Sequence, residues 1–393
     1  MVFPERFSDL PEYAFPRLRG LLDAHAPGGE VVHMTIGEPR HAFPAWISDI
    51  IRDTAAEFGR YPPNEGTPEL LGSIAGWIDR RYGVSVDAAT QLMVLNGTRE
   101  GLYNAVMALC PETKSGKPPV ILMPNPFYQV YAVAALSVGA QPVYVPATKD
   151  TGYLPDYASL PKDLLDRTAI AFLCSPSNPQ GAVAGAGYWS DLFALAEAHD
   201  FQIFADECYS EVYQGAPPKG ALEIAQKVSV HPERVVAFHS LSKRSNMPGL
   251  RSGFVAGGPA SISRIRQLRA YAGAPLPMPL QRAAEKVWAD ESHVDESRAR
   301  YVGKYGIARE VFAGVPGCDI PRAGFFLWLP VDDGEAAALK LWTRTGVRVL
   351  PGAYLARDTE TGNPGKKYIR AALVADEEEL QRGLTRLRDC LYT

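Results

Sequence analysis

The feature that most constrains the fold of this chain is a series of short, largely apolar runs separated by amphipathic stretches. The runs span residues 92–95, 119–123, 141–145, 169–174, 201–205, 235–239 and 253–257. Helical patterns occupy residues 99–109, 128–138, 188–199 and 261–270 between them. Strands that are apolar on both faces are typical of a parallel sheet covered by helices on both sides. The pattern predicts an α/β fold with a mostly parallel, doubly wound sheet of seven strands.

The two ends of the chain differ from this central part. Residues up to Pro44 are rich in proline and turn formers, and a helical pattern runs from Leu280 to about Phe312. Strand-like segments at 325–330 and 368–374 and a final helix near 377–390 follow. We therefore predict a large domain over residues 47–278 and a small α+β domain built from residues 1–46 and 279–393. A cleft between two such domains is a common place for a cofactor.

Composition excludes several classes of protein. The 393 residues carry a formal net charge of −4 without a dense Lys/Arg run, which argues against nucleic-acid binding. No stretch approaches about 18 consecutive apolar residues, and the first ten residues lack the apolar core of a signal peptide. We expect no membrane association and a cytoplasmic location. The five scattered cysteines are typical of buried fillers in a reducing compartment, and the seven histidines lack zinc-site spacing, so we expect no metal.

Reactive residues directly follow four of the predicted strands. Ligands of open α/β sheets bind at the carboxyl ends of the strands. The four segments are Asn-Gly-Thr-Arg-Glu at 96–100, Ser-Pro-Ser-Asn-Pro-Gln-Gly at 175–181, Asp-Glu-Cys-Tyr at 206–209, and Ser-Leu-Ser-Lys-Arg-Ser-Asn-Met-Pro-Gly-Leu-Arg at 240–251. We therefore expect polar and titratable groups to gather at one edge of the sheet.

Part of this set suits a phosphate group. Gly97 and Thr98 open a predicted helix, where backbone N–H groups and the positive end of the helix dipole favour anions. Ser240, Ser242 and Arg251 add hydroxyl donors and a cation around a lysine.

The remaining residues suit an electron-withdrawing pyridine ring. Asp206 can keep a pyridinium nitrogen protonated, which makes the ring an electron sink. Asn178 and Tyr209 can hydrogen-bond a phenolate oxygen. Lys243 can bond an aldehyde through its amine and, once released by substrate, move a proton between two carbons.

The order and spacing of these four segments resemble the fold-type I, class I/II aminotransferases. The resemblance covers essentially the whole chain, from Ile-Gly-Glu-Pro at 36–39 to Tyr-Ile-Arg at 368–370. It implies an aspartate aminotransferase-like fold, pyridoxal 5'-phosphate as the cofactor, and a transaminase that acts on amino acids and 2-oxo acids. It also implies a homodimer whose active site lies at the subunit interface.

The resemblance implies a role for each matching residue. Lys243 would carry the cofactor covalently and serve as the catalytic acid and base, Asp206 would pair with the pyridine nitrogen, and Tyr209 would contact the ring oxygen. The other implied positions are Gly97, Thr98, Arg99, Ser240, Ser242 and Arg251 in cofactor binding, Tyr128 stacked on the ring, Asn178 at the ring oxygen and substrate, Tyr61 reaching the phosphate from the other subunit, Gly37 over the substrate, and Arg370 on the substrate α-carboxylate. Considered alone, Asp206 also suits a turn cap and Tyr128 suits core packing.

A finer resemblance is to the N-succinyl-L,L-diaminopimelate aminotransferases of bacterial lysine biosynthesis. It rests on residues 36–42, 124–131, 207–211 and 242–246. It implies a ping-pong exchange through pyridoxamine phosphate, with glutamate and 2-oxoglutarate as the amino donor and acceptor pair. That substrate has a carboxylate remote from the reacting carbon, so Arg40 and Arg244 are candidates to bind it. Either arginine also fits an ordinary structural or surface role.

Three alternatives remain open. One is an aspartate, aromatic or kynurenine-type aminotransferase of broader specificity. Another is a related C–S lyase that uses the same cofactor and needs no oxo-acid acceptor. The third is a regulatory module that retains the fold, although Lys243, Asp206 and Arg370 together argue against it.

Overall fold

A seven-stranded sheet forms the centre of the molecule in the computed structural model, which describes residues 4–8, 10 and 12–393. Its strands follow the order β2-β8-β7-β6-β5-β3-β4. They are β2 (Leu92–Leu95), β3 (Val120–Asn125), β4 (Gln141–Pro146), β5 (Thr168–Cys174), β6 (Gln202–Asp206), β7 (Val235–Ser240) and β8 (Gly253–Gly257). Only β8 runs antiparallel to its neighbours, and β3 to β7 pair in parallel. The predicted α/β class and the mostly parallel sheet are confirmed.

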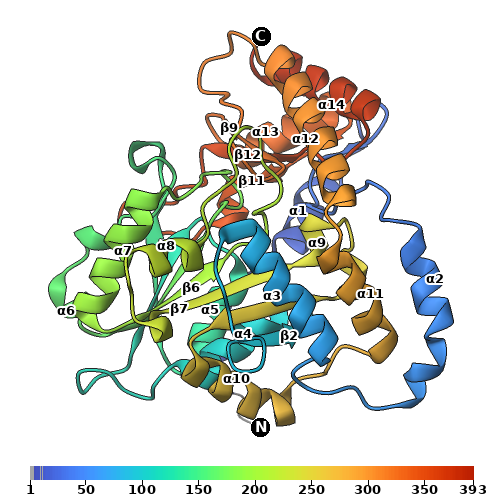
Figure 1. Ribbon diagram of the computed structural model, residues 1–393. Helices are drawn as coiled ribbons and strands as arrows, with labels where there is room; N and C mark the ends of the chain where they lie inside the picture. The colour runs from blue at the N-terminus through green and yellow to red at the C-terminus, as the bar shows by residue number, and fades with distance from the viewer. Residues whose placement is uncertain (1–3, 9, 11) are drawn as a thin grey trace.

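Helices cover both faces of this sheet, as Figure 1 shows. They are α2 (Trp46–Asp53), α3 (Pro68–Tyr82), α4 (Thr98–Leu109), α5 (Gln129–Ser137), α6 (Lys162–Leu165), α7 (Ala186–His199), α8 (Ala221–Lys227), α10 (Pro259–Ala272) and α11 (Met278–Ala289). Successive strand residues point to opposite faces. Ile121 therefore packs in the core with α4, α5 and α10, whereas Val120 and Leu122 pack with α7 and α8. Because both faces are buried, the inner strands are largely apolar, whereas the edge strand β4 is only partly buried.

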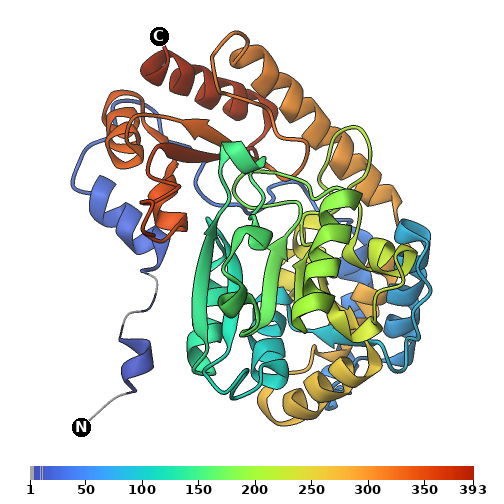
Figure 2. The same ribbon diagram turned by 90° about the vertical axis from the view of Figure 1, so that its left-hand side faces the viewer.

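The two ends of the chain form a second, smaller unit at the top of Figure 1. Its elements are α1 (Ala14–Leu22), β1 (Val32–His33), α12 (Ser292–Val311), β9 (Phe326–Pro330), α13 (Gly334–Thr345), β10 (Val347–Arg348), β11 (Leu350–Pro351), β12 (Tyr368–Ala372) and α14 (Glu377–Leu391). Strand β1 pairs with β10, which joins the N-terminal segment to the C-terminal one. In the turned view of Figure 2 this unit lies above the ends of the large sheet's strands.

The helix predicted from Leu280 to Phe312 is in fact two helices, α11 and α12. Asp290 has an extended backbone (φ −97°, ψ 130°), and its carboxylate accepts hydrogen bonds from the Ser292 hydroxyl and the His293 backbone N–H. These contacts cap the start of α12. Helix α11 then packs in one core with Trp77 of α3, beside the large sheet rather than in the predicted small domain.

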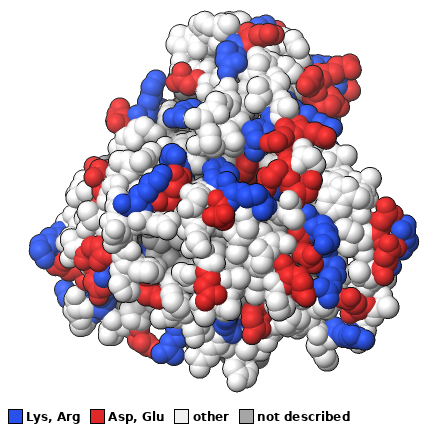
Figure 3. Space-filling view, in the orientation of Figure 1, with Lys and Arg blue, Asp and Glu red and all other residues white. Residues whose placement is uncertain are grey.

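The molecular surface is mixed in charge. On the face drawn in Figure 3, Lys and Arg side chains are interspersed with Asp and Glu side chains. Within the described part of the chain, no helix is both long and apolar enough to cross a membrane.

Candidate active site

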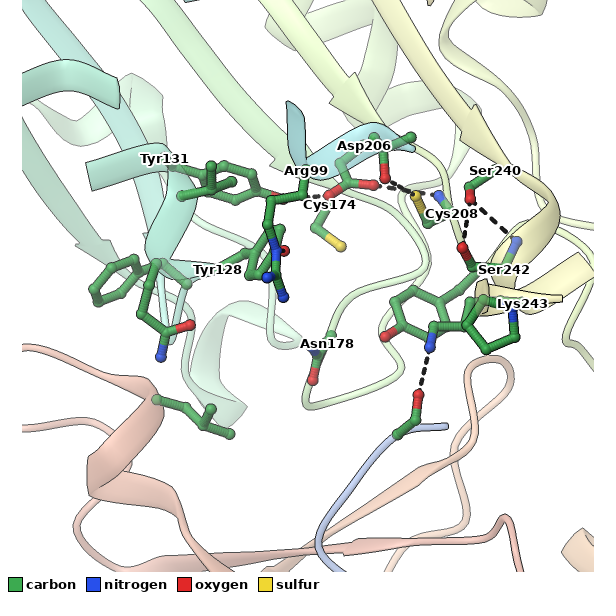
Figure 4. A pocket seen from close by; sticks show the side chains of 18 of the residues that line it. Arg99, Tyr128, Tyr131, Cys174, Asn178, Asp206, Cys208, Ser240, Ser242 and Lys243 are labelled. Carbon is green, nitrogen blue, oxygen red and sulfur yellow. Dashed lines mark hydrogen bonds between the residues drawn. The ribbon is translucent and has the colours of Figure 1, made fainter. Parts of the chain in front are cut away.

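A cavity of about 920 Å³ lies where the carboxyl ends of the large sheet's strands meet the smaller unit. Most of the residues singled out in the sequence line it. They are Gly37, Thr98, Arg99, Tyr128, Asn178, Asp206, Tyr209, Ser240, Ser242, Lys243, Arg251 and Arg370. Figure 4 shows side chains from several separate strand ends converging on this space. Four strand ends far apart in sequence therefore supply one site, because parallel strands end at the same edge.

Lys243 projects into the cavity from a one-turn helix, α9 (Leu241–Arg244), that follows β7 directly. The Ser240 hydroxyl caps this turn by accepting a hydrogen bond from the Ser242 N–H at 3.1 Å. The Lys243 Nζ donates to the Gly37 carbonyl and lies 5.4 Å from the centre of the Phe325 ring. Burial lowers the pKa of Lys243 to about 8, which increases the share of neutral, nucleophilic amine near neutral pH.

One end of the cavity gathers donors suited to a phosphate group. Gly97 has a φ of +82° and precedes the N-terminus of α4. A Cβ atom on Gly97 would lie 2.0 Å from an Arg251 guanidinium nitrogen, so a side chain here would displace the guanidinium, and the positive φ favours glycine as well. The hydroxyls of Thr98, Ser240 and Ser242 lie alongside, with the Ser240 hydroxyl donating to Ser242 at 2.8 Å. A helix N-terminus, three hydroxyls and a guanidinium form a donor set that fits a phosphate.

Asp206 provides a carboxylate deeper in the cavity, at the end of β6. Asp206 is 5 % exposed. The Tyr131 hydroxyl donates to Asp206 Oδ2 at 2.7 Å, and the Cys208 N–H donates to Oδ1 at 3.3 Å. A carboxylate oriented by such donors suits a partner with a protonated pyridine nitrogen. The residues present thus fit both ends of pyridoxal phosphate.

Tyr131 is a functional candidate that the sequence analysis missed. Its side chain is fully buried, and its ring stacks on Phe172 at 4.2 Å. Tyr131 lies inside α5 rather than directly after a strand, so its contact with Asp206 depends on how that helix packs on the sheet. Its position three residues after Tyr128 is the signal that places both tyrosines on one side of the helix start.

Arg370 on β12 faces the cavity from the opposite side. It donates to Asn178 Oδ1 at 3.0 Å and to the Thr35 carbonyl at 2.8 Å. Burial lowers the pKa of Arg370 to about 10, which leaves the guanidinium charged at neutral pH. Burial also raises the pKa of Tyr209, so its hydroxyl remains a hydrogen-bond donor. A buried cation beside an amide suits a substrate carboxylate.

Arg99 extends from α4 into the same cavity, beside Tyr128 (Figure 4). Its Nε donates to the Tyr128 hydroxyl at 2.7 Å. This hydrogen bond to Tyr128 is the main reason why the pKa of Arg99 is raised. Among the described residues, no carboxylate forms an ion pair with it. Arg99 is therefore a cation at the cavity whose charge no acidic side chain offsets.

Two of the predicted substrate arginines do not line the cavity. Successive residues of a helical turn point about 100° apart, so Lys243 and Arg244 face different directions. Arg244 is 3 % exposed, donates to the Val287 carbonyl at 3.0 Å and pairs with Glu291 at 2.7 Å. Arg244 therefore lies outside the cavity lining, away from the position that its predicted substrate contact requires. Arg40 pairs with Glu379 of α14 at 3.0 Å, outside the cavity lining.

The position of Tyr61 is compatible with its predicted role at the phosphate of the other subunit, whereas two cysteines lie in an unexpected place. The Tyr61 side chain is fully exposed and does not line the cavity of its own chain. Cys174 and Cys208, expected to be inert fillers, line the cavity beside Asp206. The Cys208 Sγ lies 3.1 Å from the Thr98 hydroxyl. Burial raises the pKa of both thiols, so they remain neutral.

Comparison with known proteins agrees with this geometry. Residues 29–387 match the family aminotransferase class I and II. The chain is 30% identical to an LL-diaminopimelate aminotransferase of Dehalococcoides mccartyi, over 98% of each chain. An aminotransferase structure from Neisseria meningitidis superimposes with a TM-score of 0.95 at 36% identity, covering 100% of both chains.

A further solved structure is similar to a lesser degree. It is a probable N-succinyldiaminopimelate aminotransferase from Thermus thermophilus, with a TM-score of 0.83 and 25% identity over 96% of this chain and 98% of that one. The family match spans nearly the whole chain and includes every residue that lines the cavity except Tyr13, Ala14 and Phe15. The chain therefore belongs to the class I and II aminotransferases, a family of pyridoxal phosphate-dependent transaminases.

Proposed function

We propose that this aminotransferase acts on N-succinyl-L,L-diaminopimelate, with glutamate and 2-oxoglutarate as the donor and acceptor pair. The observation that carries the proposal is the Arg99 guanidinium, which forms no ion pair with any described carboxylate and lies in the same cavity as Lys243 and Arg370. Arg370 suits the carboxylate on the reacting carbon, and Arg99 suits a second, remote carboxylate. The similarity to diaminopimelate aminotransferases supports the same substrate class.

The surrounding wall agrees with a long substrate. Tyr13, Phe15 and Ile36 line the cavity together with Arg99 and add apolar surface. Such surface suits the methylene groups of a substrate that separates its two charged ends. An aspartate-sized substrate would leave this part of the cavity without a partner. We therefore propose that Arg99, rather than Arg40 or Arg244, binds the remote carboxylate.

In the proposed reaction the chain's residues have distinct tasks. The bound cofactor supplies an electron sink for the bond that breaks at the substrate's α-carbon. Lys243, aided by its lowered pKa, would act as the base that takes the proton from that carbon and then as the acid that returns it. Asp206 holds the ring nitrogen, and Arg370 with Asn178 orients the substrate through its α-carboxylate. The phosphate would be held by Thr98, Ser240, Ser242, Arg251 and the backbone beside Gly97 and Arg99.

Unmodified L,L-diaminopimelate is the second candidate. The curated relatives are aminotransferases of that compound, and it differs by a free ammonium group at the remote end. A remote ammonium requires a carboxylate partner. Of the lining carboxylates, Glu100 pairs with Arg269 and Asp206 accepts from Tyr131, whereas Glu38 is exposed. Glu38 is therefore the lining carboxylate that would bind the remote ammonium group of this second candidate.

The decisive experiment compares substrates on the purified protein loaded with pyridoxal phosphate. Glutamate is added first, and loss of the cofactor's visible absorption band reports the half-reaction. Coupled turnover is then measured with N-succinyl-L,L-diaminopimelate, L,L-diaminopimelate, aspartate and tyrosine, each with 2-oxoglutarate. We expect kcat/KM to be highest for the succinylated compound. Equal or better turnover of the free diamine or of aspartate would overturn the substrate while leaving the transaminase in place. Pyruvate release from a thioether amino acid such as cystathionine, without an oxo acid, would instead indicate a C–S lyase.

A further inference from the structure

A second buried lysine lies outside the cavity, on helix α12. Lys304 is 1 % exposed, so its ammonium group is held out of water, which is costly unless hydrogen bonds compensate. Its Nζ contacts His41 Nε2 at 2.7 Å and donates to the Val374 carbonyl at 3.2 Å. It also lies 5.3 Å from the centre of the Tyr301 ring. None of the steps above uses Lys304 or His41.

The contact between Lys304 and His41 requires a neutral imidazole. An ammonium group only donates, so His41 Nε2 accepts and the ring proton lies on Nδ1. That Nδ1 is buried and has no hydrogen-bond partner among the residues that the structure describes. Burial, followed by the charges of Lys304 and Arg300, lowers the pKa of His41 to about 4. Burial lowers the pKa of Lys304 to about 8, which leaves a charged donor and a neutral acceptor at neutral pH.

The charged groups around the pair come from three elements. Helix α12 contributes Arg300 and the titratable Tyr301, the N-terminal segment contributes Arg40, and the start of α14 contributes Asp376 and Glu377. The two carboxylates favour the charged lysine, and the two arginines oppose it. None of these groups accepts a hydrogen bond from His41 Nδ1. A second proton on the imidazole would therefore add a positive charge without gaining a hydrogen-bond partner.

His41 ends a segment, residues 34–41, that crosses the cavity and that we call the strap. At its start, the Met34 carbonyl accepts from the Ala372 N–H at 2.8 Å. In its middle, the Thr35 carbonyl accepts from Arg370 and the Gly37 carbonyl accepts from Lys243. Figure 4 shows this middle part directly opposite the Lys243 amine. The strap therefore touches both the candidate catalytic lysine and the candidate carboxylate-binding arginine.

Two contacts hold the far end of the strap, and they differ in strength. The Arg40–Glu379 ion pair has side chains 42% and 23% exposed, and exposed pairs of this kind stabilise little. The His41–Lys304 hydrogen bond has a charged donor that is buried, which makes it the stronger of the two. His41 also packs on the Tyr301 ring at 4.8 Å, and Tyr301 stacks on Phe325 at 5.5 Å. Phe325 in turn lies under the Lys243 amine.

We propose that Lys304 and His41 are a positioning pair that anchors the strap over Lys243 and thereby determines how firmly the amino-acid substrate is enclosed. Neither residue touches the cavity itself, so both act through Gly37 and its neighbours in the strap. This role rests on the transaminase activity alone and does not depend on which substrate is the natural one.

The pair also makes the strap sensitive to acid. In a released strap His41 would have its ordinary pKa of 6.5, whereas in the anchored strap the value is about 4. The released form therefore binds a proton more readily, and anchoring weakens as the pH falls below 6.5. Because the released form binds a proton at a higher pH than the anchored form, the equilibrium constant for anchoring falls about 30-fold at pH 5. Above pH 6.5 the anchored form is fully favoured as far as His41 is concerned.

The test is amide hydrogen exchange of peptides covering residues 34–41 in wild type, Lys304→Met and His41→Gln, without substrate. Lys340→Met, the same change at an exposed lysine of α13, is the matched control. At pH 7.5 we expect exchange of the strap about tenfold faster in Lys304→Met, and no change in the control, because a buried charge-assisted hydrogen bond is lost. His41→Gln keeps an uncharged acceptor and should match wild type at pH 7.5.

A kinetic measurement accompanies the exchange experiment. With glutamate in the half-reaction, Lys304→Met should raise KM about tenfold while kcat stays within about twofold, since the pair affects enclosure rather than chemistry. After correction for intrinsic exchange, lowering the pH to 5 should loosen the strap in wild type but not in His41→Gln. Equal strap exchange in Lys304→Met and the control would overturn the proposal. If Lys304→Met does not fold, identical acid loosening in wild type and His41→Gln would overturn it instead.

Discussion

The hydroxyl of Tyr131 and the carboxylate of Asp206 form the contact that prepares the cavity for a pyridine ring. Both residues are buried, and the Tyr131 ring is held in place between Phe172 and Tyr128. The orientation of the carboxylate is therefore set by packing in the core as well as by the turn that follows β6. Asp206 itself was evident from its motif, but its partner depends on which helix packs above the strand.

Replacing Tyr131 with phenylalanine should weaken cofactor binding. The change removes only the hydroxyl that donates to Asp206 Oδ2 at 2.7 Å. A hydrogen bond to a buried charged group contributes about 2 kcal/mol, so we expect the Kd for pyridoxal phosphate to rise about thirtyfold. Cofactor titration followed by absorbance measures this. Tyr157→Phe, which removes a buried hydroxyl donating to the Phe172 carbonyl, is the control and should leave the Kd unchanged.

Replacing Arg99 with glutamine should discriminate between substrates. Glutamine retains a donor near the Tyr128 hydroxyl but removes the positive charge. We expect kcat/KM to fall about tenfold or more for substrates with a remote carboxylate and to change little for uncharged amino acids, as loss of one charge-assisted contact implies. Steady-state kinetics on both substrate classes test this, with the exposed Arg264→Gln as the control. A uniform loss across both classes would instead assign the Arg99 side chain to the cofactor.

At the scale of elements, the site depends on how α4 is held against the sheet. Helix α10 contributes Arg269, which is 2 % exposed and pairs with Glu100 of α4 at 2.6 Å. The same guanidinium donates to the Val94 carbonyl of β2 at 2.9 Å. One buried cation thus joins two helices and a strand directly behind the loop that carries Gly97 and Thr98. This arrangement keeps the helix N-terminus in a defined position for an anion.

Removing Arg269 should destabilise the fold more than it changes the chemistry. In Arg269→Met, Glu100 loses its ion-pair partner and Val94 loses a donor, so we expect the free energy of unfolding to fall by about 3 kcal/mol. Urea unfolding measures the loss. Adding Glu100→Gln removes the unpaired charge and should restore part of the stability. A double variant no more stable than the single one would show that the ion pair is not the cause.

At the scale of the whole molecule, the cavity of one chain leaves Tyr61 outside. The side chain is fully exposed, yet the family resemblance places it at the phosphate of a second subunit. In a symmetric dimer each site would then combine Lys243 from one chain with Tyr61 from the other.

Mixed dimers of Lys243→Ala and Tyr61→Ala test this arrangement. If Tyr61 acts on the neighbouring subunit, each mixed dimer contains one site with both residues intact. Random mixing makes half of the dimers mixed, so about a quarter of wild-type activity should return from two inactive parents. The measurement is activity after unfolding and refolding the two variants together. If Tyr61 acted within its own chain, no mixed site would be complete and activity would stay at the level of the parents.

The positions of the large sheet's strands and most of the cavity residues followed from local sequence. Strands buried on both faces must be apolar throughout, so residues 235–239 were recognisable without knowing their neighbours. The reactive residues come directly after such strands, so Lys243 and Asp206 were recognisable for the same reason. Helix α3 and strand β10 did not stand out, because their burial depends on distant partners such as α11 and β1.

Contacts between distant segments were decided only by the tertiary structure. Lys243 and Arg244 are adjacent and both basic, yet Lys243 faces the cavity and Arg244 pairs with Glu291. The reason is that successive residues of a helix point about 100° apart. The meeting of His41 with Lys304, 263 residues apart, follows the same principle. Local sequence determines which residues are suited to a strand, a cap or a reaction. Which of them share one buried space depends on packing between segments hundreds of residues apart, and that information is not contained in any short stretch of the chain.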